Sequence, residues 1–293
     1  MLCGRLLAHG SCALFLLASA SAASAGDVDG IIADDGKWSG AYVGLNAGYG
    51  WSDLRSTNDF GSAPANFFAF DVIGLAQHQN DRLDGYVVGG QVGFQRQFGR
   101  WVLGVEGTLD ATGMDDSAKT DWQFDNIGCF GFFCIGAAGA GAQTLDAKID
   151  QLYMVSGKIG YAFDDWLAYV RGGYAGANVT AQSSIGGDVI GCFGGCIMVP
   201  VSTSSKDQKR MNGWSVGGGL ERMVLPNLTI GVEYNYISLG AETFAFNGDL
   251  NIDGVSLPNS YKARIDPDSI QTVTFRMNFL LNSPEHVAAA PLK

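Results

Sequence analysis

The chain has 293 residues, a formal net charge of −11 and 47% hydrophobic residues. This acidic balance argues against nucleic acid as a partner, because binding to phosphates requires an excess of Lys and Arg. Glycine contributes 42 residues, about twice its ~7% average share. After residue 25, no uncharged apolar run reaches the ~20 residues of a spanning helix, which argues against a helical membrane protein.

Residues 1–25 are typical of an export signal. Arg5 supplies the positive end, residues 12–18 the apolar stretch, and Ala23-Ser24-Ala25 the small-residue cleavage site. We therefore predict that residues 1–25 are removed and that residues 26–37 form a periplasmic N-terminal segment. Cleavage also removes Cys3 and Cys12.

The remaining chain predicts eight β-strands of about ten residues each. Apolar and small or polar residues alternate with period two, which places one set toward lipid and the other toward an interior. In the first segment, for example, Val43 and Leu45 lie on the opposite face from Asn46. The eight segments lie at about residues 40–52, 84–98, 101–110, 151–163, 166–174, 212–223, 228–236 and 270–279.

Two kinds of connection alternate along these segments. Short turns follow Phe98, Phe163 and Leu225, and aromatic residues beside them are typical of a membrane interface. We expect this end to be periplasmic and the long loops to be exterior, at about residues 53–83, 112–150, 178–211 and 238–269. The fold class predicted is all-β, an eight-stranded antiparallel up-and-down transmembrane β-barrel over residues 38–279, with a periplasmic tail at 280–293.

A soluble Gly-rich β-sandwich is the competing interpretation, since it would also alternate. It predicts a charged face opposite the apolar one, whereas here that face carries mainly Gly, Ser, Thr, Asn and Gln. The composition of the second face favours the barrel.

Several short runs in the strands carry a family resemblance. They are Gly40–Trp51, Leu103–Gly107, Gly157–Phe163, Gly213–Glu221 and Val232–Tyr236. Together and in this order they resemble the small outer-membrane β-barrel family of porin-family or opacity-type surface antigens, with an OmpA-like barrel. The resemblance implies a Gram-negative outer-membrane protein with roles in envelope stability, surface exposure or solute passage.

The resemblance also implies partners. These are outer-membrane lipid and lipopolysaccharide, and the barrel-assembly machinery, which reads a terminal aromatic residue in such proteins. Phe279 fits that residue, but fourteen residues follow it. The chain therefore departs from the family pattern at its C-terminal end.

Seven charged residues fall on the inward face of the predicted strands: Glu106, Asp110, Lys158, Arg171, Glu221, Glu233 and Arg276. The interior of an eight-stranded barrel is just wide enough for side chains to fill it. We therefore expect these charges to pair and plug the lumen, since desolvated charges require partners. A polar lining for a narrow water path and a catalytic site are the alternatives.

A catalytic role is disfavoured by the scarcity of histidine. Small outer-membrane enzymes use a histidine as general base, and after cleavage only His78 and His286 remain, neither in a predicted membrane strand. No catalytic residue, cofactor or metal is assigned.

Four cysteines remain after cleavage, in two near-duplicate segments. In an exported protein Cys129, Cys134, Cys192 and Cys196 favour disulfides in one of three connectivities. Zinc is the weaker alternative, because no histidine lies near. The disulfides would close a knob within each loop, or the loops would present a contact patch of Phe130, Phe132, Phe133 and Phe193 to a host surface, a neighbouring barrel or lipid.

The predicted function is a structural, surface-exposed outer-membrane barrel that contributes to envelope integrity and surface interactions. A narrow pore for small hydrophilic solutes is the alternative. A lipid-modifying enzyme comes third.

Overall fold

The computed structural model describes residues 36–59 and 78–281 as an all-β structure. The predicted signal 1–25 and most of the two terminal segments, 26–35 and 282–293, lie outside the described residues. In the described part no helix is long and apolar enough to cross a membrane. The strands are β1 Gly40–Asp59, β2 His78–Phe98, β3 Trp101–Phe130, β4 Phe133–Phe163, β5 Trp166–Phe193, β6 Cys196–Leu225, β7 Leu228–Leu239, β8 Glu242–Ile252 and β9 Val255–Leu280.

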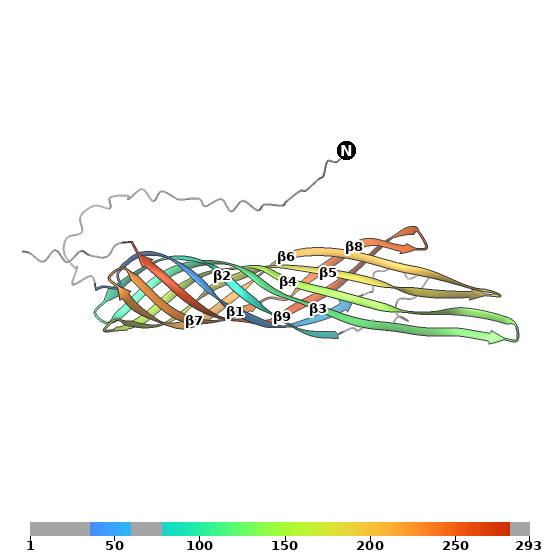
Figure 1. Cartoon of the computed structure of the whole chain (residues 1–293), viewed down its shortest axis with the longest axis horizontal. Coiled ribbons are helices and arrows are strands. Elements are labelled where there is room, and N and C mark those ends of the chain that lie inside the picture. The colour runs from blue at the N-terminus through green and yellow to red at the C-terminus, as the bar shows by residue number, and fades with distance from the viewer. Residues whose placement is uncertain (1–35, 60–77, 282–293) are drawn as a thin grey trace, which may run out of the picture. The chain divides into compact units, whose positions relative to one another are not determined.

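The strands form one antiparallel sheet that closes on itself. Strands β1 to β7 pair in chain order, β7 pairs with β9, and β9 pairs with β1, for example at Val43 and Phe279. Eight strands therefore make a closed ring, as predicted (Figure 1). Closure satisfies the backbone groups within the ring, which a lipid environment requires.

The remaining strand, β8, forms a hairpin with β9. It pairs with β6 only at Val201–Ile252 and Ser202–Asn251. This hairpin occupies most of the segment 238–269 that the sequence predicted as a loop.

Two further segments predicted as loops are strand in the structure. Residues 112–150 and 178–211 continue β3, β4, β5 and β6, with turns at 131–132 and 194–195. Figure 1 shows these two hairpins running on beyond β2 and β7. The loop assignment failed because pairing between neighbouring strands and an apolar inward face hold the segments extended, although the outward face is not continuously apolar. We call the end of the barrel with the tips at 131–132 and 194–195 the hairpin end. We call the opposite end, with the turns at 99–100, 164–165 and 226–227, the turn end.

The outward face of the ring is apolar. Leu45, Val92 and Val155 are each 63–69% exposed, and the same face carries Phe94, Val170, Val232 and Phe275. Near the turn end, the rings of Trp101 and Tyr161 meet edge to face with centroids 5.4 Å apart. Such a continuous apolar band with aromatic residues at its margin is the surface that a bilayer covers.

The interior is filled in three layers along the strands. Chain order along β4 shows them: Ala162 lies in an apolar layer at the turn end, Lys158 in a charged layer, and Met154 and Leu152 in an apolar layer toward the hairpin end. The sequence predicted an inward face of mainly glycine and small polar residues. The structure corrects this for the hairpin half, where inward apolar side chains such as Leu145, Ile149 and Met211 fill the interior by packing on one another.

Trp38 closes the layer at the turn end. It is fully buried and packs with Val102, Ala162, Leu167 and Tyr169. Its backbone N–H donates to Oε1 of Gln97 at 3.1 Å. Residues just before β1 thus fold across the end of the ring.

Candidate functional site

Two matching groups of three residues position the acidic side chains of the charged layer. Tyr42, Gly93 and Glu106 pair side by side across β1, β2 and β3. Tyr169, Gly219 and Glu233 do the same across β5, β6 and β7. In each group, which we call a Tyr-Gly-Glu rung, glycine leaves the space through which the tyrosine reaches the glutamate.

The hydrogen bonds of the two rungs match as well. The hydroxyl of Tyr42 donates to Oε2 of Glu106 at 2.7 Å, and that of Tyr169 donates to Oε2 of Glu233 at 2.6 Å. A Cβ on Gly93 would lie 2.4 Å from the Tyr42 ring, and a Cβ on Gly219 would lie 2.6 Å from the Tyr169 hydroxyl oxygen. The rungs therefore require glycine at their centres.

Two arginines join the rungs across the lumen. Arg171 contacts Glu106 and lies 3.1 Å from Oε1 of Glu233, while Arg276 lies 2.6 Å from Oε2 of Glu106 and also contacts Glu233. All four side chains are at most 3% exposed. Two carboxylates and two guanidinium groups thus form a neutral, buried cluster, in which charge-assisted hydrogen bonds offset the loss of hydration.

Lys158 forms a second ion pair in the same layer. Its Nζ lies 3.0 Å from Oε1 of Glu221 and 4.0 Å from the centroid of the Tyr169 ring. The hydroxyl of Thr229 also donates to Glu221, at 3.4 Å. Cation–π contact therefore links this pair to the rung of Tyr169.

Asp110 lies apart from the ion pairs. It is buried, and its Oδ1 accepts a hydrogen bond of 2.8 Å from Asn46. Asn46 also donates to Gln91, which donates to Asn278 at 2.7 Å. Of the seven inward charges named from the sequence, the structure brings six into contact and places Asp110 in this amide cluster.

Four contributors to the filled lumen were not foreseen from the sequence. They are Tyr42 and Tyr169, which the alternation assigns to the inward face, together with Trp38 and the apolar layer around Met154. Large aromatic residues on a face otherwise made of glycine and small polar residues were the available signal.

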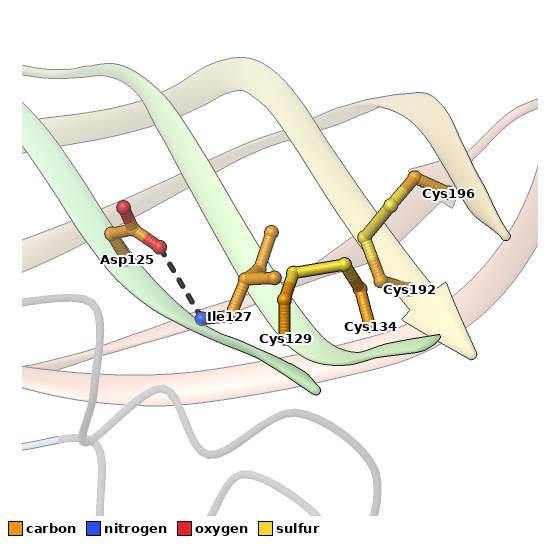
Figure 2. Close-up of a disulfide and its surroundings, with 6 residues drawn as sticks. All are labelled: Asp125, Ile127, Cys129, Cys134, Cys192 and Cys196. Carbon is orange, nitrogen blue, oxygen red and sulfur yellow. Dashed lines mark hydrogen bonds between the residues drawn. A yellow bond between two sulfur atoms is a disulfide. The ribbon is translucent and has the colours of Figure 1, made fainter. Parts of the chain in front are cut away.

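The four cysteines form two disulfides, one within each hairpin tip. Cys129 is bonded to Cys134, and Cys192 to Cys196 (Figure 2). The two tips lie together, because Gly136 of β4 pairs with Cys192 of β5. Of the three connectivities that the sequence left open, the structure has the one in which a disulfide closes a knob within each segment.

The phenylalanines at the tips lie partly on one another. The rings of Phe133 and Phe193 meet edge to face with centroids 5.6 Å apart. Phe130 is 81% exposed and Phe132 fully exposed. The four residues that the sequence named as a contact patch therefore gather on the two joined tips. Within the described ranges, no cluster of three or more His, Cys, Asp or Glu side chains could hold a metal.

A closed ring with an apolar outside and a filled interior that holds a buried charged layer defines an integral membrane β-barrel, and such barrels lie in outer membranes. The family model for the outer membrane protein beta-barrel domain matches residues 11–262. The chain belongs to this family, and the Gram-negative outer membrane is its location.

Two curated relatives are also outer-membrane proteins. The chain is 26% identical over 211 residues to the 31 kDa outer-membrane immunogenic protein of Brucella melitensis, a match that covers 71% of this chain and 73% of that protein. The corresponding protein of Brucella suis matches to the same extent.

Solved structures of outer-membrane proteins also match at low identity. The attachment invasion locus protein Ail of Yersinia pestis is 13% identical, with 81% of this chain and 99% of that chain covered and a TM-score of 0.30. OprG of Pseudomonas aeruginosa is 10% identical, with 83% and 97% covered and a TM-score of 0.37.

Proposed function

We propose that the protein is a structural outer-membrane barrel with an occluded lumen, which anchors the two disulfide-closed hairpins at the cell surface and contributes to envelope integrity. The turn end and both termini lie in the periplasm, and the hairpin end faces the exterior. Short turns on one side and long extensions on the other support this orientation, since outer-membrane barrels have short periplasmic turns.

The observation that carries the proposal is the filled lumen. The cluster of Glu106, Glu233, Arg171 and Arg276 lies between two apolar layers, one of which is closed by Trp38. A pore for hydrophilic solutes would need a continuous polar path, and both apolar layers interrupt it. We therefore favour anchoring over solute passage.

Conductance tests this directly. The refolded full-length protein in planar bilayers is expected to give no steady, reproducible current. Stable single-channel steps would support the narrow pore instead. A barrel of known conductance, refolded and inserted in the same way, serves as the positive control.

A second candidate function, surface contact, is favoured by the exposed tips. Phe130 and Phe132 are uncovered, whereas Phe133 and Phe193 hold the tips together. Apolar side chains presented in this way are typical of contact sites.

Cell attachment tests this second function. Bacteria that display a Phe130→Ser, Phe132→Ser variant are expected to attach to host cell layers less than bacteria with the native protein. A Val255→Ser variant is the control, because Val255 is an exposed apolar residue at the β8–β9 turn, away from these tips. Equal attachment of all three at equal surface levels would contradict the contact role.

A further inference from the structure

The outward face of β4, β5 and β6 changes its chemistry at a level marked by tyrosines. Tyr153 and Tyr174 both donate hydrogen bonds to Oδ1 of Asn212, at 3.0 and 2.5 Å. On the turn side of this level the face is apolar, with Val155, Val170 and Val216 exposed. Hydroxyl-bonded tyrosines at the margin of an apolar band mark the edge of the bilayer.

Beyond the tyrosines the same face becomes polar over five consecutive rows of paired residues. Each row takes one residue from each of β4, β5 and β6, and most of these side chains carry an amide, a hydroxyl or a charge. Their members, in order from the tyrosines, are Gln151–Asn178–Arg210, Lys148–Thr180–Gln208, Asp146–Gln182–Lys206, Thr144–Ser184–Ser204 and Ala142–Gly186–Ser202.

Hydrogen bonds within and between the rows fix the side chains in place. Asn178 donates to Oε1 of Gln151 at 2.9 Å, and the hydroxyls of Ser184 and Ser204 lie 3.1 Å apart. Thr180 donates to Asp150, the bulged residue of β4, at 2.7 Å. The face is therefore pre-organised, which lowers the entropy cost of binding.

A cavity of about 830 Å³ lies at the far end of these rows. Hydroxyls of Thr144, Ser184, Ser202 and Ser204 line it, together with Asp249 and Asn251 from β8. Ala142, Gly186 and Gly248 leave room between them. The lining residues include no Lys or Arg, and Ile185 is the one apolar side chain among them that is larger than a methyl group.

This lining selects a class of ligand. Hydroxyls and amides both donate and accept hydrogen bonds, as the hydroxyls of a sugar do. An acyl chain would need an apolar wall, and a phosphate would need cations or free backbone N–H groups. A saccharide fits the cavity and the polar rows that lead to it.

The position of the face identifies which saccharide it meets. The face continues outward from the lipid-covered band, and Ser184 follows Tyr174 by ten residues of β5, which is about 30 Å along a strand. A molecule that stands beside the barrel in the outer leaflet would therefore carry its sugars along these rows. We propose that the outward face of β4–β6, ending in the cavity, binds the core saccharide of lipopolysaccharide; this inference rests on the orientation in the proposed function.

Gly186 offers a clean way to block the cavity. A Cβ added there meets no atom within 4 Å, so a larger side chain enters the cavity without a clash at its base. Gly191 on the same strand is equally free and does not line the cavity. Gly186→Leu and Gly191→Leu are therefore a matched test and control.

The experiment measures binding of two probes to the full-length protein in detergent micelles. The probes are purified lipopolysaccharide that keeps its core saccharide and lipid A that lacks it. Gly186→Leu is expected to weaken binding of the first probe about tenfold, as for one or two lost hydrogen bonds, and to leave lipid A binding unchanged. Gly191→Leu is expected to behave as the native protein with both probes.

Each other outcome overturns the inference. Unchanged binding of the core-bearing probe to Gly186→Leu shows that the cavity does not hold the saccharide, and an equal loss for both probes shows that only the lipid portion is recognised. Free core oligosaccharide, added as competitor, should displace the first probe; failure to compete also contradicts the proposal.

The orientation is tested separately. A peptide tag inserted at the β8–β9 turn is expected to bind antibody on intact cells. If it does not, the proposed function fails at its orientation. If it does, and Gly186→Leu still binds normally, the saccharide inference alone fails.

Discussion

Arg171 bridges the two halves of the charged layer. It contacts Glu106 and Glu233 and is held further by Thr108 at 3.4 Å. Arg171→Ala leaves buried carboxylate charge under-compensated, so we expect the free energy of unfolding to fall by about 3–5 kcal/mol. Urea titration in detergent micelles measures the change.

The control for this variant is Arg264→Ala, since Arg264 is exposed. Equal midpoints for both variants would contradict a structural role for the network. The bilayer conductance of Arg171→Ala should stay at zero, because the apolar layers on both sides remain.

Gly93 tests the fit of the Tyr-Gly-Glu rung. A Cβ there would meet the Tyr42 ring at 2.4 Å and the Val105 carbonyl oxygen at 2.8 Å. Gly93→Ala is therefore expected to destabilise the barrel by about 1–3 kcal/mol through overpacking. Gly157→Ala, whose Cβ would meet no atom within 4 Å, should change the urea midpoint far less. A smaller effect at Gly93 than at Gly157 would refute the packing argument.

The inward charges could be named from the sequence because period two assigns each strand residue to a face. Their partners could not, because pairing across a lumen depends on the register of strands that are far apart in the chain. Arg276 reaches Glu106 across 170 positions. Asp110 was grouped with the ion pairs because its face was known and its height along the barrel was not.

At the scale of elements, the segment before β1 is fastened to the β4–β5 turn. Nζ of Lys37 lies 2.6 Å from Oδ1 of Asp165, and the hydrogen bond from Lys37 lowers the pKa of Asp165. A lowered carboxyl pKa means that this contact stabilises the segment above the unfolded pKa of Asp, about 3.9, and that the contribution is lost as the pH falls through the folded value.

Acid should therefore loosen the turn end locally. We expect the protection of the amides of residues 36–39, measured as the intrinsic exchange rate divided by the observed rate, to fall below about pH 4 while the ring stays protected. In Asp165→Asn the protection of these amides should already be low at neutral pH and should change little further in acid. A native protein whose exchange at these residues follows only the intrinsic pH dependence would contradict the role of the pair.

The lengths of the elements were predictable only where the outward face is apolar. Residues 151–163 alternate against lipid and were recognised, whereas 133–150 continue the same strand with an outward face of mainly small and polar residues and with Leu145 and Ile149 buried inside. Strand formation there depends on pairing with β3 and β5 and on burial of the inward side chains, and neither requires an apolar outward face. Within these segments, only the tips could be anticipated from the sequence, because two close pairs of cysteines in near-duplicate segments suggested tips closed by disulfides.

At the scale of the whole described barrel, the features that hold the ring lie apart from the hairpin ends. Closure of β1 on β9, the Tyr-Gly-Glu rungs and the Trp38 layer all use residues nearer the turn end than the cavity. The sequence indicated the ring, because lipid imposes a strict alternation on it. The sequence did not indicate where the ring-forming part of each strand ends and the displayed part begins, because the alternation of residues continues from one part into the other.

Shortening the hairpins tests the division. One variant replaces residues 123–140 and 188–200 with two-residue Asn-Gly turns, which join the paired positions Trp122–Gly141 and Gly187–Val201. We expect it to refold, to keep its heat-dependent shift in gel mobility, and to keep a urea midpoint close to that of the native protein. It removes the tips but keeps the row Ala142–Gly186–Ser202 at the cavity.

The shortened variant therefore separates the two surface roles. Attachment to host cells should fall, because Phe130, Phe132 and Phe193 are gone, while the core-bearing lipopolysaccharide should still bind more tightly than lipid A. Loss of the heat-dependent shift would mean that the hairpin ends help to hold the ring closed, and the division of the strands into an anchoring part and a displayed part would be wrong.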